Sequence, residues 1–212
     1  MTLAHAMTPA EHAALRGAAR DLHARFRGTF GEETIDALLL SSYQELAATA
    51  TVPNWLVLGA ERFAAQRLQA LAHTEQRAGG TPAVLFMCVH NAGRSQMALG
   101  WFTHLARGRA VAWSAGSEPV AGVSPAAVAA MAEAGIDITA EFPKPWTDEV
   151  VRAADVVITM GCGDACPLFP GKHYEDWELA DPAGKTLAEI RPIRDQIRDL
   201  VATLLERLRI PA

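Results

Sequence analysis

AVLFMCVHNAGRSQMA, residues 83–98, joins an apolar run to a short polar loop and then to a segment with helical periodicity. An apolar run as short and continuous as 83–87 is typical of a buried strand in a parallel sheet, and residues 94–106 predict the helix that follows it. Open α/β sheets bind their ligands beyond the carboxyl ends of the strands. The stretch therefore predicts an α/β domain whose functional residues begin at Cys88.

The residues that follow this stretch continue the alternation of strands and helices up to about residue 208. The predicted elements are a strand at 110–113, a turn at 114–116, a helix from Ser124-Pro125 to Gly135, a short helix from Thr147 to Ala153, strands at 156–160 and 173–179, and a helix at about 186–208. This order predicts an α/β fold with a four-stranded parallel sheet, helices on both faces and right-handed crossovers.

Residues 1–78 differ in composition: they hold four Gly and two Pro, whereas the other 134 residues hold twelve Gly and ten Pro. Thr8-Pro9-Ala10-Glu11 has the spacing of a capping box with Pro at the first helical position, which predicts the start of a helix. Two further apolar stripes with helical spacing follow it. We therefore expect a small all-α three-helix bundle at 1–76, a linker at 77–82 and the α/β domain at 83–212.

The composition excludes several classes of protein. The 212 residues include 19 Lys and Arg against 24 Asp and Glu, a net charge of −5, and no basic run suited to nucleic acid or anionic lipid. No apolar stretch approaches the roughly 18 residues of a membrane-spanning helix, and residues 1–11 lack the features of a secretion signal. Three cysteines are too few for a disulfide framework. We therefore expect a cytoplasmic protein with no nucleic-acid or membrane partner.

The loop Cys88–Ser95 has the residue types that a binding site for a tetrahedral oxyanion requires. Successive main-chain N–H groups of a tight loop at a helix N-terminus converge on an anion. Asn91 and Gly93 tolerate the positive φ that such a turn uses, and the Arg94 guanidinium suits a pair of anionic oxygens. The predicted binding residues are Val89, His90, Asn91, Ala92, Gly93, Arg94 and Ser95, where His90 contacts the anion or only shapes the loop.

Cys88 stands at the base of this loop and is the candidate nucleophile. The N–H groups, the helix dipole and Arg94 all favour a thiolate there over a thiol, and the Ser95 hydroxyl can donate to the sulfur. The alternative is an inert buried cysteine, a common role for a free cysteine. The composition of the loop favours the nucleophile.

Asp181-Pro182 follows the fourth predicted strand, whose end returns to the edge of the sheet where Cys88 lies. A carboxylic acid at that place can protonate an oxygen that leaves the tetrahedral centre. The alternative is an Asp-Pro turn or a helix cap, which is a frequent local use of aspartate. Because the oxyanion loop is expected nearby, we interpret Asp181 as a general acid.

The other two cysteines, Cys162 and Cys166, directly follow the third predicted strand and so belong to the same edge as Cys88. At this spacing their Cα atoms can come within the roughly 4.4–6.8 Å of a disulfide, and the glycines on either side of Cys162 let it move toward Cys88. The alternatives are half of a zinc site or two inert thiols. Zinc needs two further ligands, and because His90 and His173 form no paired motif we expect no metal.

These segments together carry a resemblance to a known family. Residues 81–209 resemble the low-molecular-weight protein tyrosine phosphatase fold, and more narrowly the arsenate reductases built on it, through CVHNAGRSQMA (88–98), SAG (114–116), TMGCGDACP (159–167) and DPAGK (181–185). The resemblance implies that Cys88 attacks arsenate while Arg94 holds the oxyanion. It further implies that Cys162 attacks the adduct and releases arsenite, that Cys166 takes over the disulfide, and that thioredoxin reduces it, with no tightly bound cofactor.

The resemblance is uneven, and alternatives stay open. Ala183-Gly184 stand where the phosphatases carry an aromatic pair, and Leu99 stands where some of the reductases have a Glu that helps bind potassium. A phosphatase would use Cys88 and Asp181 without the other cysteines. Phosphate and sulfate share the shape of arsenate, so both are expected to compete with it.

Two further readings concern the thiols. The short spacing of Cys162 and Cys166 looks like actinobacterial-type enzymes, some of which are coupled to mycothiol and need Cys88 alone. A sensor would bind arsenite with all three thiols and show no turnover. An N-terminal three-helix domain accompanies some thioredoxin-coupled members, which favours thioredoxin. The sequence leaves the oligomeric state and the role of residues 1–76 open.

Overall fold

The computed structural model describes residues 7–49, 55–75, 80–161 and 168–210. Contacts divide the chain into two compact units, residues 1–77 and 78–212. The bounds 1–76, 77–82 and 83–212 inferred above stay a prediction, because this division gives no linker. Within the described ranges, no helix combines the length and the apolar character needed to cross a membrane.

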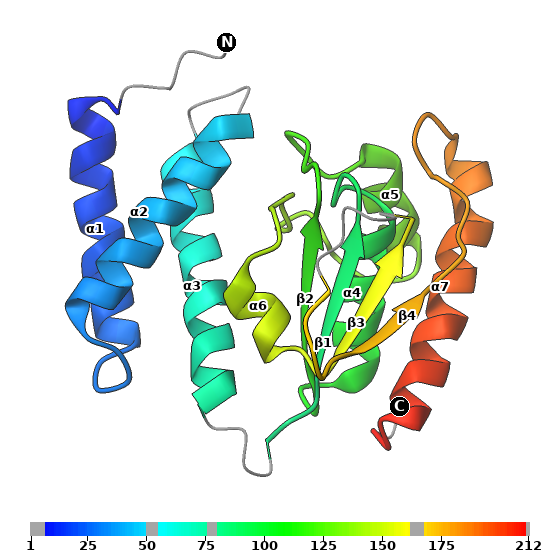
Figure 1. Ribbon diagram of the computed structural model, residues 1–212. Helices are drawn as coiled ribbons and strands as arrows, with labels where there is room; N and C mark the ends of the chain where they lie inside the picture. The colour runs from blue at the N-terminus through cyan, green and yellow to red at the C-terminus, as the bar shows by residue number, and fades with distance from the viewer. Residues whose placement is uncertain (1–6, 50–54, 76–79, 162–167, 211–212) are drawn as a thin grey trace. The chain divides into compact units, whose positions relative to one another are not determined.

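In the first unit the described residues form the helices α1 (Pro9–Arg25), α2 (Glu32–Thr49) and α3 (Leu56–Glu75), which are labelled in Figure 1. Helix α1 begins as predicted, because Thr8 and Glu11 form a capping box. Tyr43 on α2 donates a hydrogen bond to Glu11 Oε1 at 3.0 Å. Its burial, and to a smaller extent this hydrogen bond, raise the pKa of Tyr43 to about 12. The cap of α1 is therefore tied to α2.

The second unit is built on a four-stranded sheet with the order β2-β1-β3-β4, in which every neighbouring pair is parallel. This confirms the predicted fold class. The elements are β1 (Ala83–Cys88), α4 (Arg94–Ala106), β2 (Val111–Gly116), α5 (Pro125–Glu133), α6 (Asp148–Ala153), β3 (Val156–Met160), β4 (His173–Asp176) and α7 (Leu187–Arg207).

Two predicted boundaries were wrong. Residues 114–116 are the end of β2 rather than a turn, because they stay paired in register with Phe86, Met87 and Cys88 of β1. Strand β4 ends at Asp176, three residues before its predicted end. Small residues such as those of 114–116 suggest a turn locally, but pairing with a buried central strand holds them extended.

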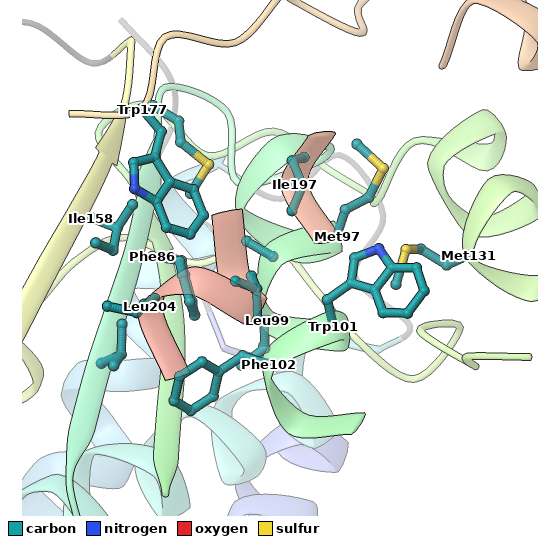
Figure 2. Close-up of a cluster of buried hydrophobic side chains, with 14 of the residues drawn as sticks. Phe86, Met97, Leu99, Trp101, Phe102, Met131, Ile158, Trp177, Ile197 and Leu204 are labelled. Carbon is teal, nitrogen blue, oxygen red and sulfur yellow. The ribbon is translucent and has the colours of Figure 1, made fainter. Parts of the chain in front are cut away.

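One face of the sheet packs against α4, α5 and α7 around an aromatic cluster. The ring centroid of Phe86 on β1 lies 5.6 Å from that of Phe102 on α4 and 5.7 Å from that of Trp177. Figure 2 shows these side chains within the cluster. Burying a side chain such as Phe86 contributes about 1.5–3 kcal/mol. Helix α6 contacts β1 from the opposite side of the sheet (Figure 1). This packing fixes β1 and α4, the two elements that the oxyanion loop connects.

Candidate active site

Cys88 is the last residue of β1 and is buried, with its Sγ 3.0 Å from the Oγ of Ser95. Ser95 lies in the first turn of α4, and its Oγ also accepts a hydrogen bond from Asn91 Nδ2 at 2.8 Å. A hydroxyl has one proton and two lone pairs. Asn91 occupies one of these lone pairs, and a thiolate can only accept, so with Cys88 ionised the Ser95 proton is directed to Cys88 Sγ.

The loop between β1 and α4 turns at Asn91, which has a φ of +48° as expected from its sequence. The same expectation for Gly93 was wrong, because its φ is −131°. Gly93 is needed for a different reason: a Cβ at this position would lie 2.6 Å from Pro182 Cγ. Glycine therefore lets the oxyanion loop and the Asp181-Pro182 loop approach each other closely.

The carbonyl groups of residues 88–93 all accept a hydrogen bond from outside the loop. The donors are Gln96 Nε2, at 2.9 Å, and the main-chain N–H groups of Met97, Ser117, Glu118, Val120 and Ser124, at 2.8–3.3 Å. Carbonyl groups that point outward leave the N–H groups of the same peptides pointing inward. The structure records no acceptor for the N–H groups of residues 90–95 among the described residues.

Several residues of this loop line a cavity of about 240 Å³. Its lining residues are Cys88, His90, Ala92, Gly93, Arg94, Val120, Gly122, Ser124, Asp181, Pro182 and Ala183. The cavity thus brings together the sulfur, the start of α4, a guanidinium and a carboxylate. Converging N–H donors beside a guanidinium suit a small oxyanion.

Arg94 reaches across the cavity to the loop after β4. Its Nη1 lies 3.5 Å from the carbonyl oxygen of Leu179, and its Nη2 lies 3.7 Å from Asp181 Oδ1. Gly161, at the end of β3, has a φ of +76°, and a Cβ there would lie 3.0 Å from Arg94 Nη1. The guanidinium is therefore positioned by two strand ends besides its own helix.

The surroundings of Asp181 fit both roles considered for it, a local turn and a general acid. Its Oδ1 accepts from the N–H of Ala183 at 3.1 Å, which is the local turn. Its side chain is 57% exposed and lines the cavity beside Arg94, where a general acid would lie. The carboxylate is more loosely held than Cys88.

The remaining predicted residues differ in what the structure says of them. His90 is exposed and lines the cavity, whereas the side chain of Val89 is half-buried. Cys162 and Cys166 lie outside the described residues, so their distances from Cys88 stay a prediction. Among the ranges the structure describes, no group of three or more His, Cys, Asp or Glu side chains could hold a metal ion.

A buried polar cluster behind the loop was missed by the sequence reasoning. It consists of Gln96, Ser114 and Lys144, each at most 2% exposed, and it contacts Asn91. The three residues come from α4, β2 and the segment before α6, so no local motif joins them. A polar side chain in the first turn of α4, at Gln96, was the available signal.

The family follows from comparison with known proteins. Residues 83–210 match the model of the low molecular weight phosphotyrosine protein phosphatases. The chain belongs to this family. Residues 15–72 match the N-terminal domain of protein-tyrosine-phosphatase-like proteins.

Several relatives of known name are similar to the chain. A solved structure of the Corynebacterium glutamicum thioredoxin-dependent arsenate reductase Cg_ArsC1' is 42% identical, covers 93% of this chain and 97% of its own, and has a TM-score of 0.81. The glutaredoxin arsenate reductase of Synechocystis sp. is 37% identical over 59% of this chain and 97% of its own length. Arsenate reductase 1 of Staphylococcus epidermidis is 36% identical over 59% of this chain and 96% of its own length.

Proposed function

We propose that the protein is an arsenate reductase, which converts arsenate to arsenite through Cys88 and a disulfide cascade, with thioredoxin as the reductant. The observation that carries the proposal is the position of the Cys88 sulfur. It is hydrogen-bonded to Ser95, and Cys88 lines the cavity together with Arg94. The similarity over nearly the whole chain to a thioredoxin-dependent arsenate reductase supports this choice of substrate and reductant.

The first step forms a bond between sulfur and arsenic. The Cys88 thiolate attacks arsenic(V), and an arsenate oxygen leaves as water once it has been protonated. Asp181, which lines the cavity, gives that proton in our proposal. The N–H groups of the loop and Arg94 stabilise the negative charge on the other oxygens.

The following steps exchange thiols and disulfides. Cys162 attacks Cys88 Sγ, and the electron pair of the sulfur–arsenic bond passes to arsenic, which leaves as arsenite. Cys166 then attacks Cys162, which releases Cys88 as a thiolate, and thioredoxin reduces the Cys162–Cys166 disulfide by the same exchange chemistry. Arsenate and two thiols thus become arsenite, a disulfide and water.

The lining of the cavity favours an inorganic oxyanion over an aryl phosphate. Beside Cys88, Arg94 and Asp181, the described residues that line it include small ones such as Ala183 and Ser124. Among these described lining residues there is no Phe, Tyr or Trp on which an aryl group could stack. Phosphate and sulfate fit the same space and are expected to compete with arsenate.

The cascade is tested with the single variants Cys162→Ser and Cys166→Ser in an assay that couples arsenate reduction to thioredoxin, thioredoxin reductase and NADPH. We expect no arsenite from Cys162→Ser, and about one arsenite per protein from Cys166→Ser, since each later thiol acts once in sequence. The matched control is the same pair of variants with mycothiol and a mycoredoxin. Full thioredoxin-coupled turnover by both variants would overturn the cascade.

The phosphatase alternative is separated by a second substrate. Hydrolysis of p-nitrophenyl phosphate by the wild-type chain at a rate above that of arsenate reduction, with a large loss in Asp181→Asn, would favour a phosphatase. We expect the reverse order of rates. The Cys162→Ser variant serves as the control, because a phosphatase does not need this thiol.

A further inference from the structure

Lys144 is a buried lysine that contacts the oxyanion loop at Asn91 and is not among the lining residues of the cavity. It is 2% exposed, and its Nζ lies 3.4 Å from Ser114 Oγ, 3.2 Å from the Phe142 carbonyl oxygen and 3.6 Å from Glu141 Oε2. The Nζ also lies 4.5 Å from the centroid of the Phe142 ring. Two oxygens, a carboxylate and an aromatic face are the surroundings that stabilise a buried ammonium group.

Lys144 contacts the loop in two ways. Its main-chain N–H donates to Asn91 Oδ1 at 3.0 Å. Its ammonium group donates to Ser114 Oγ, which lies 3.4 Å from Gln96 Oε1, and Gln96 Nε2 donates to the carbonyl oxygen and to Oδ1 of Asn91 at 2.9 and 3.2 Å. The contacts form a closed ring of hydrogen bonds around Asn91.

The ammonium group sets the direction of the bonds at Ser114. It can only donate, so Ser114 accepts from it and can give its single proton to Gln96 Oε1. This proton supports the orientation of the Gln96 amide, whose Nε2 also donates to the carbonyl oxygens of Asn91 and Phe142. Two donors occupy Asn91 Oδ1, so Asn91 Nδ2 is left to donate to Ser95, which can then donate to a Cys88 thiolate.

We propose that Lys144 is a positioning residue, which acts through Asn91 and Ser95 to hold the oxyanion loop in shape and to keep the Ser95 proton directed at Cys88. Asn91 is held at a positive φ, a conformation that non-glycine residues rarely adopt, and the ring supplies bonds that stabilise it. The inference rests on the proposed function only in that Cys88 is the nucleophile. It does not depend on arsenic or on the later thiols.

The test compares Lys144→Met, Ser114→Ala and Lys172→Met. The Lys172 ammonium group also donates to main-chain carbonyl groups of the same unit, among them that of Ala154 at 2.7 Å, and so provides a matched control. The first readout is the pH profile of Cys88 alkylation by iodoacetamide, followed by mass spectrometry of the Cys88 peptide. The second is the dissociation constant of inorganic phosphate by calorimetry. Neither readout needs arsenate or thioredoxin, so failure of the cascade leaves this test intact.

We expect Lys144→Met to slow Cys88 alkylation near pH 6 by about tenfold and to weaken phosphate binding, since hydrogen bonds to a charged group are stronger than those between neutral groups. Ser114→Ala should shift both readouts in the same direction by less, and Lys172→Met should leave both unchanged. Added methylamine should restore the alkylation profile of Lys144→Ala but not that of Ser114→Ala.

A purely structural role gives a different result. It would lower the thermal stability of Lys144→Met while the folded protein kept the wild-type alkylation profile and phosphate affinity, and that result would overturn the proposal. If Lys144→Met does not fold, Ser114→Ala and the methylamine experiment decide in its place. Wild-type behaviour of Ser114→Ala in both readouts also contradicts the proposal.

Discussion

Helix α1 begins with a capping box, whereas the N-cap residue of α4 is Gly93, which has no side chain that could accept a hydrogen bond. In α1 the Thr8 hydroxyl accepts from the Glu11 N–H at 3.2 Å, and the Glu11 carboxylate accepts from the Thr8 N–H at 2.7 Å. In α4 the structure records no acceptor for the first N–H groups among the described residues. One helix start is satisfied by its own side chains, and the other leaves its donors to a ligand.

The difference between the two helix starts separates residues that stabilise the fold from residues that bind a ligand. A side-chain cap is worth about 1 kcal/mol, and α4 lacks this contribution at the place where an oxyanion would supply the acceptors instead. Changes at the start of α4 should therefore alter binding and chemistry first. Changes at the start of α1 should alter stability alone.

The largest effect is expected from Cys88→Ser. Arsenate reduction should fall by more than about 10³-fold, because a serine hydroxyl is a far weaker nucleophile than a thiolate at neutral pH. Phosphate binding, measured by calorimetry, should survive within a few-fold, because the N–H groups and Arg94 remain. Loss of phosphate binding would show that the sulfur shapes the cavity as well.

A smaller effect is expected from Arg94→Lys. The charge is kept but the two-pronged donor geometry is lost, so the phosphate dissociation constant should rise by roughly 10–100-fold. Phosphate should also raise the melting temperature of the wild-type chain more than that of this variant. An unchanged dissociation constant would mean that the start of α4 alone holds the anion.

The variant Gly93→Ser removes the difference between the two helices, because it gives α4 a hydroxyl cap like that of α1. The new hydroxyl should occupy N–H groups of the first turn and compete with phosphate, weakening its binding by about tenfold. Gly93→Ala is the control, because its Cβ meets Pro182 in the same way but carries no hydroxyl. Equal affinities for the two variants would attribute the whole effect to the contact with Pro182.

The smallest effect on activity is expected at the other helix start. Thr8→Ala should lower the free energy of unfolding by about 1 kcal/mol, the usual value of a lost cap, and leave arsenate reduction unchanged. Denaturant titration and the thioredoxin-coupled assay measure the two quantities. Thr8→Ser keeps the hydroxyl and should match the wild type, and a loss of activity in Thr8→Ala would contradict the separation.

Local chemistry explains what could be predicted from the sequence. The capping box at Thr8 and the positive φ of Asn91 depend on residues close together in the chain. The parallel sheet was predicted from a local pattern as well, the alternation of short apolar runs with helical segments, although its strands pair over long distances in the sequence. The end of β2 could not be predicted, because Ser114 to Gly116 are held extended by their pairing with β1. The role of Gly93 was also missed, because Pro182 is distant in sequence.

The site shows the same division. The loop from Cys88 to Ser95 is a continuous motif, and the structure places its sulfur, Arg94 and Asp181 at one cavity. The support behind the loop comes from three separate segments, so the importance of Gln96, Ser114 and Lys144 appears only when the chain is folded. The positions of Cys162 and Cys166 stay a prediction.

The segment 117–124 sets a limit on how the chain can be shortened or lengthened. It has neither helix nor strand, yet four of its main-chain N–H groups donate to carbonyl groups of the loop, those of Ser117, Glu118, Val120 and Ser124. Irregular surface segments usually tolerate insertions and deletions. Here the loss or gain of one residue between Glu118 and Ser124 would carry the amide of Ser124 away from Ala92, so the number of residues in this segment is constrained even where their identity is not.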